Sequence, residues 1–199
     1  MNKKIKQYSA LALATASILP MSCSKDKESN DVNIDDKTVN KVLNAVLISG
    51  TEFGKEDSID VNSDGQFDFD LAVGTETYSS NTYGYSFIDG KVTGNQILSN
   101  NQTFSSYTLP IVTTKNSGDK INSSSSNWEN NSYVGYKYNS AQVGIAGGGD
   151  KLIGFRFKAG ANTHYGWMKV NLSSDYKTLT IKELAYNKTP DAEIAAGSK

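Results

Sequence analysis

The segment that decides the fold reads HYGWMKVNLSSDYKTLTIKELAY, from residue 164 to residue 186. Apolar and polar side chains alternate on both sides of the polar stretch 174–176, and such alternation places one set on a core face and the other towards solvent. We therefore predict a β-hairpin that pairs residues 164–173 with residues 177–186. Glu183 interrupts its core face, so the strand either bends there or gives Glu183 a partner. That face would carry Met168, Val170, Leu172, Leu179, Ile181 and Ala185.

The same period of two recurs along much of the chain. It is clear in residues 67–73, 83–88 and 153–158, and turn-rich clusters such as 116–118 and 147–149 separate these runs. Several short strands divided by turn signals are typical of all-β folds. The sequence therefore predicts an all-β domain, an antiparallel β-sandwich, with a barrel-like arrangement as the alternative.

Residues 39–48 are ambiguous. Val39, Val42, Leu43, Val46 and Leu47 recur at helical spacing, whereas the apolar run 45–48 also fits a buried strand. Short apolar runs do not separate the two by pattern alone, so helix and strand both remain open here.

The first 22 residues have the features of an export signal. Three lysines precede a short apolar run, Ala10–Leu19, which is shorter than the roughly 20 residues that span a bilayer. Ser22-Cys23 resembles the end of a bacterial lipobox, although Pro20 is not the usual residue at its position. We expect residues 1–22 to be a lipoprotein signal peptide, Cys23 to carry the lipid, residues 23–38 to form a disordered charged tether, and residues 39–199 to form a single β domain.

Charge argues against a nucleic-acid partner. Removing residues 1–22 leaves 17 of the 20 basic side chains and all 21 acidic ones, a net charge near −4. Nucleic-acid binding requires a basic face. The expected partners are instead a membrane, reached through the lipid at the outer membrane or cell surface, and a glycan or an envelope protein.

Residues 60–68 read DVNSDGQFD, which has the form D-x-N-x-D-G-x-x-D. Ca²⁺ takes about six to eight oxygen ligands, and oxygen-bearing side chains at alternate loop positions supply them. The predicted ligands are Asp60, Asn62, Asp64, the carbonyl of Gln66, and Asp68.

This loop is not an EF-hand, because Leu71 stands where the bidentate glutamate belongs and a strand pattern follows. It resembles the calcium loops of thrombospondin type 3, dockerin and FG-GAP repeats, which implies a structural calcium ion. The alternative is a metal-free turn held by side-chain to backbone hydrogen bonds. Four clustered carboxylates argue against a metal-free turn, since like charges repel unless a cation lies among them. These carboxylates are Asp60, Asp64, Asp68 and Asp70.

Aromatic residues follow the polar loop 123–131. They would stack on a ligand such as a sugar ring, or pack within the sheet as aromatic strand residues commonly do. A second group of candidate ligand contacts lies at the start of the predicted 164–186 hairpin, around the only histidine of the chain. The candidate ligand contacts are Trp128, Tyr136, His164, Tyr165 and Trp167.

The C-terminal pattern GFRF (154–157), HYGW (164–167), AY (185–186) and AG (196–197) resembles a module of bacterial extracellular proteins. The resemblance implies a secreted or envelope-anchored, mostly β domain, and no assigned reaction.

Few catalytic arrangements fit the chain. A single histidine excludes a zinc site built on two or three histidines, and no G-x-S-x-G elbow is present. Glycoside hydrolysis by a pair of carboxylates, for instance Glu129 and Glu183, is not excluded by the sequence. We therefore predict a surface-anchored, calcium-stabilised domain with a non-catalytic binding or structural role. The alternatives are a small carbohydrate-active enzyme or glycan-binding module, and an assembly subunit that pairs through an exposed strand edge.

Overall fold

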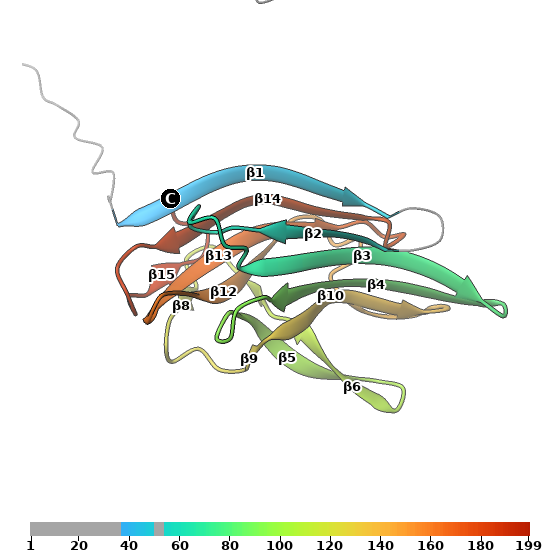
Figure 1. Ribbon diagram of the computed structural model, residues 1–199. Coiled ribbons are helices and arrows are strands. Elements are labelled where there is room, and N and C mark those ends of the chain that lie inside the picture. The colour runs from blue at the N-terminus through green and yellow to red at the C-terminus, as the bar shows by residue number, and fades with distance from the viewer. Residues whose placement is uncertain (1–36, 50–53) are drawn as a thin grey trace, which may run out of the picture. The chain divides into compact units, whose positions relative to one another are not determined.

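The computed structural model describes residues 37–49 and 54–199, and within these ranges it contains strands and no helix (Figure 1). The all-β prediction is therefore confirmed. The predicted signal peptide, Cys23 and most of the predicted tether lie outside the described residues. The strands are β1 Thr38–Ile48, β2 Lys55–Ile59, β3 Phe69–Tyr78, β4 Asn81–Gly90, β5 Gln96–Phe104, β6 Tyr107–Val112, β7 Thr114–Lys115, β8 Lys120–Ile121, β9 Trp128–Glu129, β10 Asn131–Tyr138, β11 Ala141–Gly144, β12 Lys151–Ala159, β13 Asn162–Leu172, β14 Thr178–Asn187 and β15 Ile194–Ala195.

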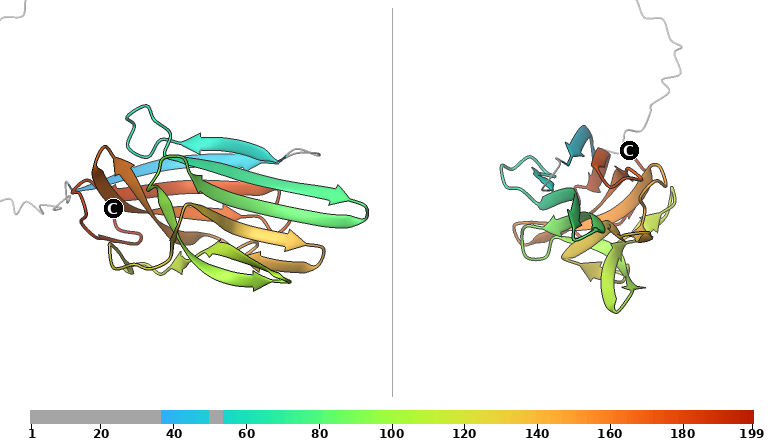
Figure 2. Two further views of the ribbon diagram at one scale, coloured as in Figure 1. Left: turned by 60° about the horizontal axis from the view of Figure 1, so that its bottom comes forward. Right: turned by 90° about the vertical axis from the view of Figure 1, so that its right-hand side faces the viewer.

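One large sheet contains nearly all of these strands. Its order is β1-β14-β13-β12-β5-β6-β10-β4-β3-β2, and neighbouring strands in this order are antiparallel except for a short parallel pairing between β10 and β6. β1 and β2, at opposite ends of this order, contact each other, and β3 contacts both β1 and β14. The sheet therefore folds back on itself around a common core, nearer to the barrel-like alternative than to two separate sheets (Figure 2). In the described residues no helix has the length and apolar character needed to cross a bilayer.

The hairpin predicted from residues 164–186 is present as β13 and β14. Ser173 and Thr178 close it by a backbone hydrogen bond, and Tyr176 adopts a left-handed conformation in the turn. Five of the six predicted core residues are fully buried in the main cluster. They are Met168, Val170, Leu172, Leu179 and Ile181.

Ala185 is the exception, and the prediction of its face is wrong. Lys169 pairs with Glu183 whereas Val170 pairs with Ile181, so β14 carries one extra residue at this point. Such a bulge moves every later side chain to the opposite face. Ala185 consequently packs in a second cluster with Trp167 and Ile194, while Leu184 takes the place in the main core.

Glu183 lies at this bulge and also has partners. Its carboxylate accepts hydrogen bonds from the ammonium groups of Lys169 and, at 3.0 Å, Lys199. These two lysines hold the pKa of Glu183 below its usual value. Both outcomes left open by the sequence, a distorted strand and a partner, therefore occur together.

Replacing Glu183 with glutamine is expected to lower the free energy of unfolding by about 1 kcal/mol at pH 7, because a hydrogen bond to a charged group is replaced by a neutral one. A carboxyl whose folded pKa is depressed stabilises the fold above its unfolded pKa and loses that contribution as the pH falls through the folded value. Urea unfolding of both proteins at pH 7 and at pH 3 measures this. The difference should shrink at pH 3, and an equal difference at both values would contradict the ion-pair assignment.

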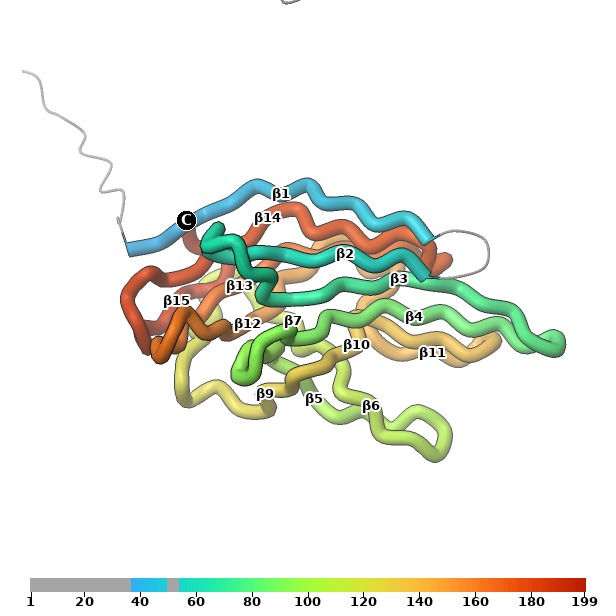
Figure 3. Tube along the Cα trace, in the orientation of Figure 1, coloured from blue at the N-terminus to red at the C-terminus, as the bar shows by residue number. Residues whose placement is uncertain are grey.

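Residues 39–48, which the sequence left undecided, form strand β1 beside β14 (Figure 3). A bulge between Val42 and Ala45, with Asn44 in a left-handed conformation, inserts one extra residue. Leu47 is buried, whereas Val42 and Val46 are exposed. The helical spacing arose because apolar residues occupy both faces of this strand.

Strand β4 turns Gly84, Ser86 and Ile88 inwards. Ser86 and Ile88 are fully buried, and the space beside Gly84 is filled by Tyr176 of the core. Because side chains alternate along a strand, Tyr83, Tyr85 and Phe87 point to the outer side of the sheet, where each is partly exposed.

Candidate functional site

Three aromatic pairs lie side by side on the outer side of β4 and β10. The register places Tyr83 opposite Tyr138, Tyr85 opposite Tyr136, and Phe87 opposite Tyr133. The ring centroids of the first pair are 5.0 Å apart and those of the third 6.2 Å, distances that are typical of interacting aromatic side chains. Cross-strand contacts of this kind hold the rings in fixed positions on the sheet.

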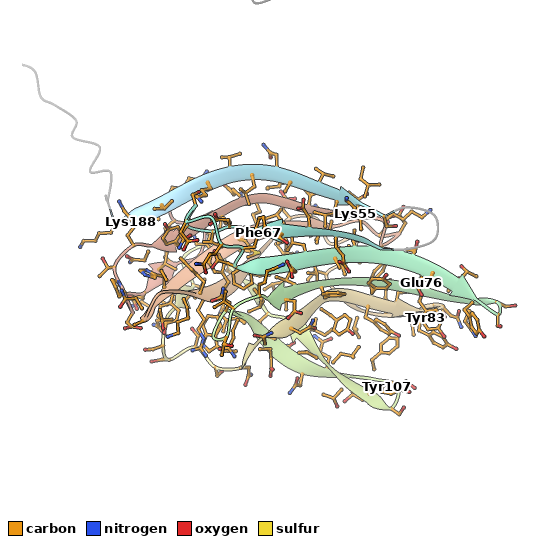
Figure 4. The ribbon with its side chains drawn as sticks, in the orientation of Figure 1. Lys55, Phe67, Glu76, Tyr83, Tyr107 and Lys188 are labelled. Carbon is orange, nitrogen blue, oxygen red and sulfur yellow. The ribbon has the colours of Figure 1, made fainter. Side chains whose placement is uncertain are left out.

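The β5–β6 hairpin extends this surface. The ring of Phe104 meets that of Tyr136 edge to face at 5.1 Å, and Ile111 pairs with Tyr133 across the parallel contact. Tyr107, opposite Phe104 in the hairpin, is 69% exposed. In Figure 4, Tyr83 and Tyr107 lie towards the same end of the sheet, away from Phe67. We call this surface the tyrosine face; it comprises Tyr83, Tyr85, Phe87, Phe104, Tyr107, Tyr133, Tyr136 and Tyr138.

The hydroxyl groups of Tyr85 and Tyr136 on this face are neutral hydrogen-bonding groups at physiological pH, because their pKa values are raised. Burial among the rings raises the pKa of Tyr136, and the nearby Tyr133 and Tyr83 raise it further. Burial likewise raises the pKa of Tyr85, whose hydroxyl donates to Glu76 at 3.3 Å. A neutral tyrosine both donates and accepts, so the surface combines apolar rings with uncharged polar groups.

Of the candidate ligand contacts named from the sequence, Tyr136 alone belongs to the tyrosine face. Trp167 is fully buried, and its indole Nε1 donates to the carbonyl of Ser198 at 3.1 Å. His164 is 7% exposed, stacks on Phe157, and its Nδ1 donates to the carbonyl of Asn187 at 2.9 Å. Both side chains are hydrogen-bonded and buried, so they are core residues and not part of an exposed binding surface.

Trp128 and Tyr165 form a separate ring contact, with centroids 5.9 Å apart. Tyr165 is buried, whereas Trp128 is half-buried in β9 with the guanidinium of Arg156 lying 4.9 Å from its ring centroid. This cation–π contact covers one side of the indole. Trp128 and Tyr165 pack in the second core cluster, which contains none of the residues of the tyrosine face.

Sequence reasoning did not nominate Tyr83, Tyr85, Phe87 or Tyr107 for a site. The available signal was the alternation in β4 of aromatic residues with the non-aromatic residues Gly84, Ser86 and Ile88. Because these three residues face the core, the aromatic residues of β4 face outwards. Pattern alone did not say which set faces the core.

The predicted calcium loop is a tight turn organised by Asp60. Its two carboxylate oxygens accept the backbone N–H groups of Ser63 at 2.6 Å and Gly65 at 2.9 Å. The Asn62 side-chain oxygen accepts the N–H of Asp64 at 3.0 Å, and the Asp64 carboxylate accepts that of Gln66 at 2.8 Å. Gly65 has φ +89°, a backbone conformation that favours glycine and allows the sharp turn at this position.

Asp68 closes the loop from the start of the sheet. It is 4% exposed, and its carboxylate accepts the N–H of Val61 at 2.8 Å and the amide of Asn95 at 3.2 Å. Burial raises its pKa, and the negative charges of Asp64 and Asp60 raise it further. The three carboxylates are therefore close enough to repel one another.

The donor types suit a hard cation. Carboxylate, amide and carbonyl oxygens are the ligands that Ca²⁺ takes, and the predicted set contains all three. Within the described ranges, no three acidic, histidine or cysteine side chains form a metal-binding group by themselves. The predicted set instead relies on Asn62 and the Gln66 carbonyl alongside the acids.

A polar hollow of about 320 Å³ lies under the serine-rich loop. Its walls are formed by Leu98–Asn100, Thr113, Lys115 and residues 124–127. The polar loop noted in the sequence at residues 123–131 therefore borders a recess at the base of the β5–β6 hairpin.

Comparisons with protein-family models, curated proteins and solved structures found no match to this chain.

Proposed function

We propose that this chain is a lipid-anchored domain of the bacterial cell surface that acts by non-catalytic binding, with the tyrosine face as its binding surface. The observation that carries the proposal is the concentration of partly exposed rings on one side of β4 and β10. A contiguous aromatic surface on a soluble domain is characteristic of an interaction site.

Binding is favoured over catalysis by the state of the titratable groups. The only histidine, His164, is buried and hydrogen-bonded to a backbone carbonyl. Glu183, one of the two acids considered for glycoside hydrolysis, is held by Lys169 and Lys199 with a lowered pKa. A general acid requires a raised pKa near the working pH, so an ion-paired glutamate is better suited to a structural role.

Two measurements test this proposal. The full chain, made in a bacterial host with labelled palmitate, should take up the label, and a Cys23→Ala variant should not. The purified chain should also co-sediment with cell envelopes of the bacterium that encodes it, and combined Tyr107→Ala and Tyr136→Ala changes should weaken that retention about tenfold, since the loss of central aromatic contacts commonly costs more than 1 kcal/mol each.

Phe67→Ala is the matched control, because Phe67 is also an exposed aromatic residue, 53% accessible, but lies outside the tyrosine face. Retention should be unchanged in this variant. Absence of retention for the wild-type chain, or equal loss in the control, would refute binding through the tyrosine face.

We further propose that Asp60, Asn62, Asp64, Asp68 and the Gln66 carbonyl hold a structural Ca²⁺. The ion would neutralise the mutual repulsion of the three carboxylates and brace the turn that leads into β3. Supporting observations are the Asp60 carboxylate, which folds back onto the backbone N–H groups of Ser63 and Gly65, and the glycine conformation at residue 65.

Calcium is expected to raise the melting temperature by several degrees, because a ligand at 100 times its Kd stabilises a fold by about 2.7 kcal/mol. Asp64→Asn keeps the loop hydrogen bond but removes a charge, so most of the calcium-dependent shift should disappear. Asp57→Asn, a nearby acid outside the predicted ligand set, should retain it. Scanning calorimetry with calcium and with EDTA measures the shift, and identical melting in both buffers would contradict the calcium site.

A further inference from the structure

We infer that the ligand of the tyrosine face is a carbohydrate, specifically a neutral glycan chain rich in hydroxyl groups. This inference rests on the proposed function and names the chemical class of partner for that surface. It follows from the composition of the face, the polar groups beside it and the fixed positions of the rings.

The rings provide an apolar surface with polar edges. Tyr83, Tyr136 and Tyr138 each present a flat hydrocarbon body and a hydroxyl group. A sugar ring has the complementary construction, with C–H groups on its faces and hydroxyls around its rim. Tyrosine supplies contact area of this amphipathic kind at a low cost in conformational entropy.

Amide side chains border the rings on the same side of the sheet. Asn100 pairs with Ile111, and Ile111 pairs with Tyr133, so these three side chains share one face. Gln102, two residues further along β5, shares that face, and its amide donates to Asn100 at 3.3 Å. Amides both donate and accept, and together with the neutral tyrosine hydroxyls they match the mixed donors and acceptors of a sugar.

The charge of this region favours a neutral glycan over an acidic one. Glu76 contacts the face by accepting a hydrogen bond from the Tyr85 hydroxyl, and the negative charge of Glu56 also acts on that hydroxyl. An anionic polymer would meet the Glu76 carboxylate with like charge, whereas a neutral sugar hydroxyl would donate to it. Glu76 lies opposite Tyr83 on the neighbouring strand β3, at the edge of the ring array.

The rings are held in place before any ligand arrives. Phe104 meets Tyr136 edge to face, Tyr136 meets Tyr133 at 5.7 Å, and Tyr133 meets Phe87. Tyr85 is further fixed over Gly74 and Gly54, where an added Cβ would come within 2.6 Å of its ring or hydroxyl. Side chains already fixed lose little freedom on binding, which raises the affinity available from each contact.

The experiment uses the purified full chain and two kinds of probe. In native gels cast with starch, xylan, mannan or a β-glucan, retardation reports binding to a defined neutral polysaccharide. Tyr107→Ala is the principal variant because its side chain is largely exposed, so the fold should survive its removal; unchanged circular dichroism melting checks this. We expect at least one polysaccharide to retard the wild type and the Phe67→Ala control, with about tenfold weaker binding for Tyr107→Ala.

The second probe is envelope material treated in two ways. Periodate cleaves vicinal diols and so destroys glycans, whereas proteinase K destroys proteins. Loss of retention after periodate, with retention kept after proteinase K, supports the glycan even when the panel contains no matching polymer. Retention that survives periodate but not proteinase K overturns the glycan while leaving binding intact, and no retention on untreated material overturns the proposed function itself.

Discussion

Gly166→Ala is expected to lower the free energy of unfolding by about 3 kcal/mol or more, enough to unfold a marginally stable domain. An added Cβ at this position would lie 2.2 Å from the ring of Phe155 and 2.6 Å from the backbone carbonyl oxygen of Ala185. Phe155 is fully buried in the main core, and Ala185 belongs to the adjacent strand β14, so neither neighbour has room to move.

Gly154→Ala is the matched control in the same strand pair. Its added Cβ would meet the end of the Leu98 side chain at 2.6 Å, and a terminal methyl group can rotate away. The expected loss is about 1 kcal/mol. Urea unfolding of both variants measures the difference, and a Gly166→Ala protein as stable as Gly154→Ala would show that the Phe155–Gly166–Ala185 packing is wrong.

Trp167→Ala is expected to cost about 3–5 kcal/mol, the usual range for removing a fully buried aromatic side chain. Trp167 fills the second core cluster with Leu98, Ile121 and Ile194, and its indole donates to Ser198. The change would therefore open a cavity and free the C-terminal segment. Binding by protein that remains folded should be unaffected, because Trp167 does not belong to the tyrosine face.

Phenylalanine substitutions separate packing from hydrogen bonding. Trp167→Phe leaves the Ser198 carbonyl without its donor, whereas the Nε1 of Trp128 has no hydrogen-bond partner to lose. Trp167→Phe should therefore destabilise more than Trp128→Phe, by about 1 kcal/mol. If both variants lost the same free energy of unfolding, the hydrogen bond from the Trp167 indole to Ser198 would contribute nothing measurable to stability.

The C-terminal hairpin could be predicted because the alternation of apolar and polar residues in both strands agrees with the polar turn at residues 174–176. Strands β13 and β14 begin and end within two residues of the predicted limits. The face of Ala185 could not be predicted, since a bulge depends on how β14 accommodates Glu183 against Lys169. One inserted residue reverses the face of every later side chain.

The tyrosine face was harder to predict for a related reason. Alternation in residues 83–88 defines two faces but does not assign either to the core, and the outward rings of β4 pair with β10, about fifty residues later in the sequence. His164 and Trp167, the most conspicuous candidates by residue type, are core residues instead. Tyr136 was a candidate because it follows the polar loop in the sequence. Its ring contacts depend on the register between β10 and β4, which the sequence pattern does not give.

The measurement that tests the central claim most directly is the nitration of tyrosines by tetranitromethane on intact cells that display the chain. Mass spectrometry would compare Tyr107, which is 69% exposed, with Tyr78, which is 74% exposed at the tip of β3 and makes no ring contact of its own among the described residues. If the tyrosine face binds a surface partner, Tyr107 is protected on cells relative to the purified protein while Tyr78 is modified equally in both. Equal modification of Tyr107 in the two settings would contradict the account.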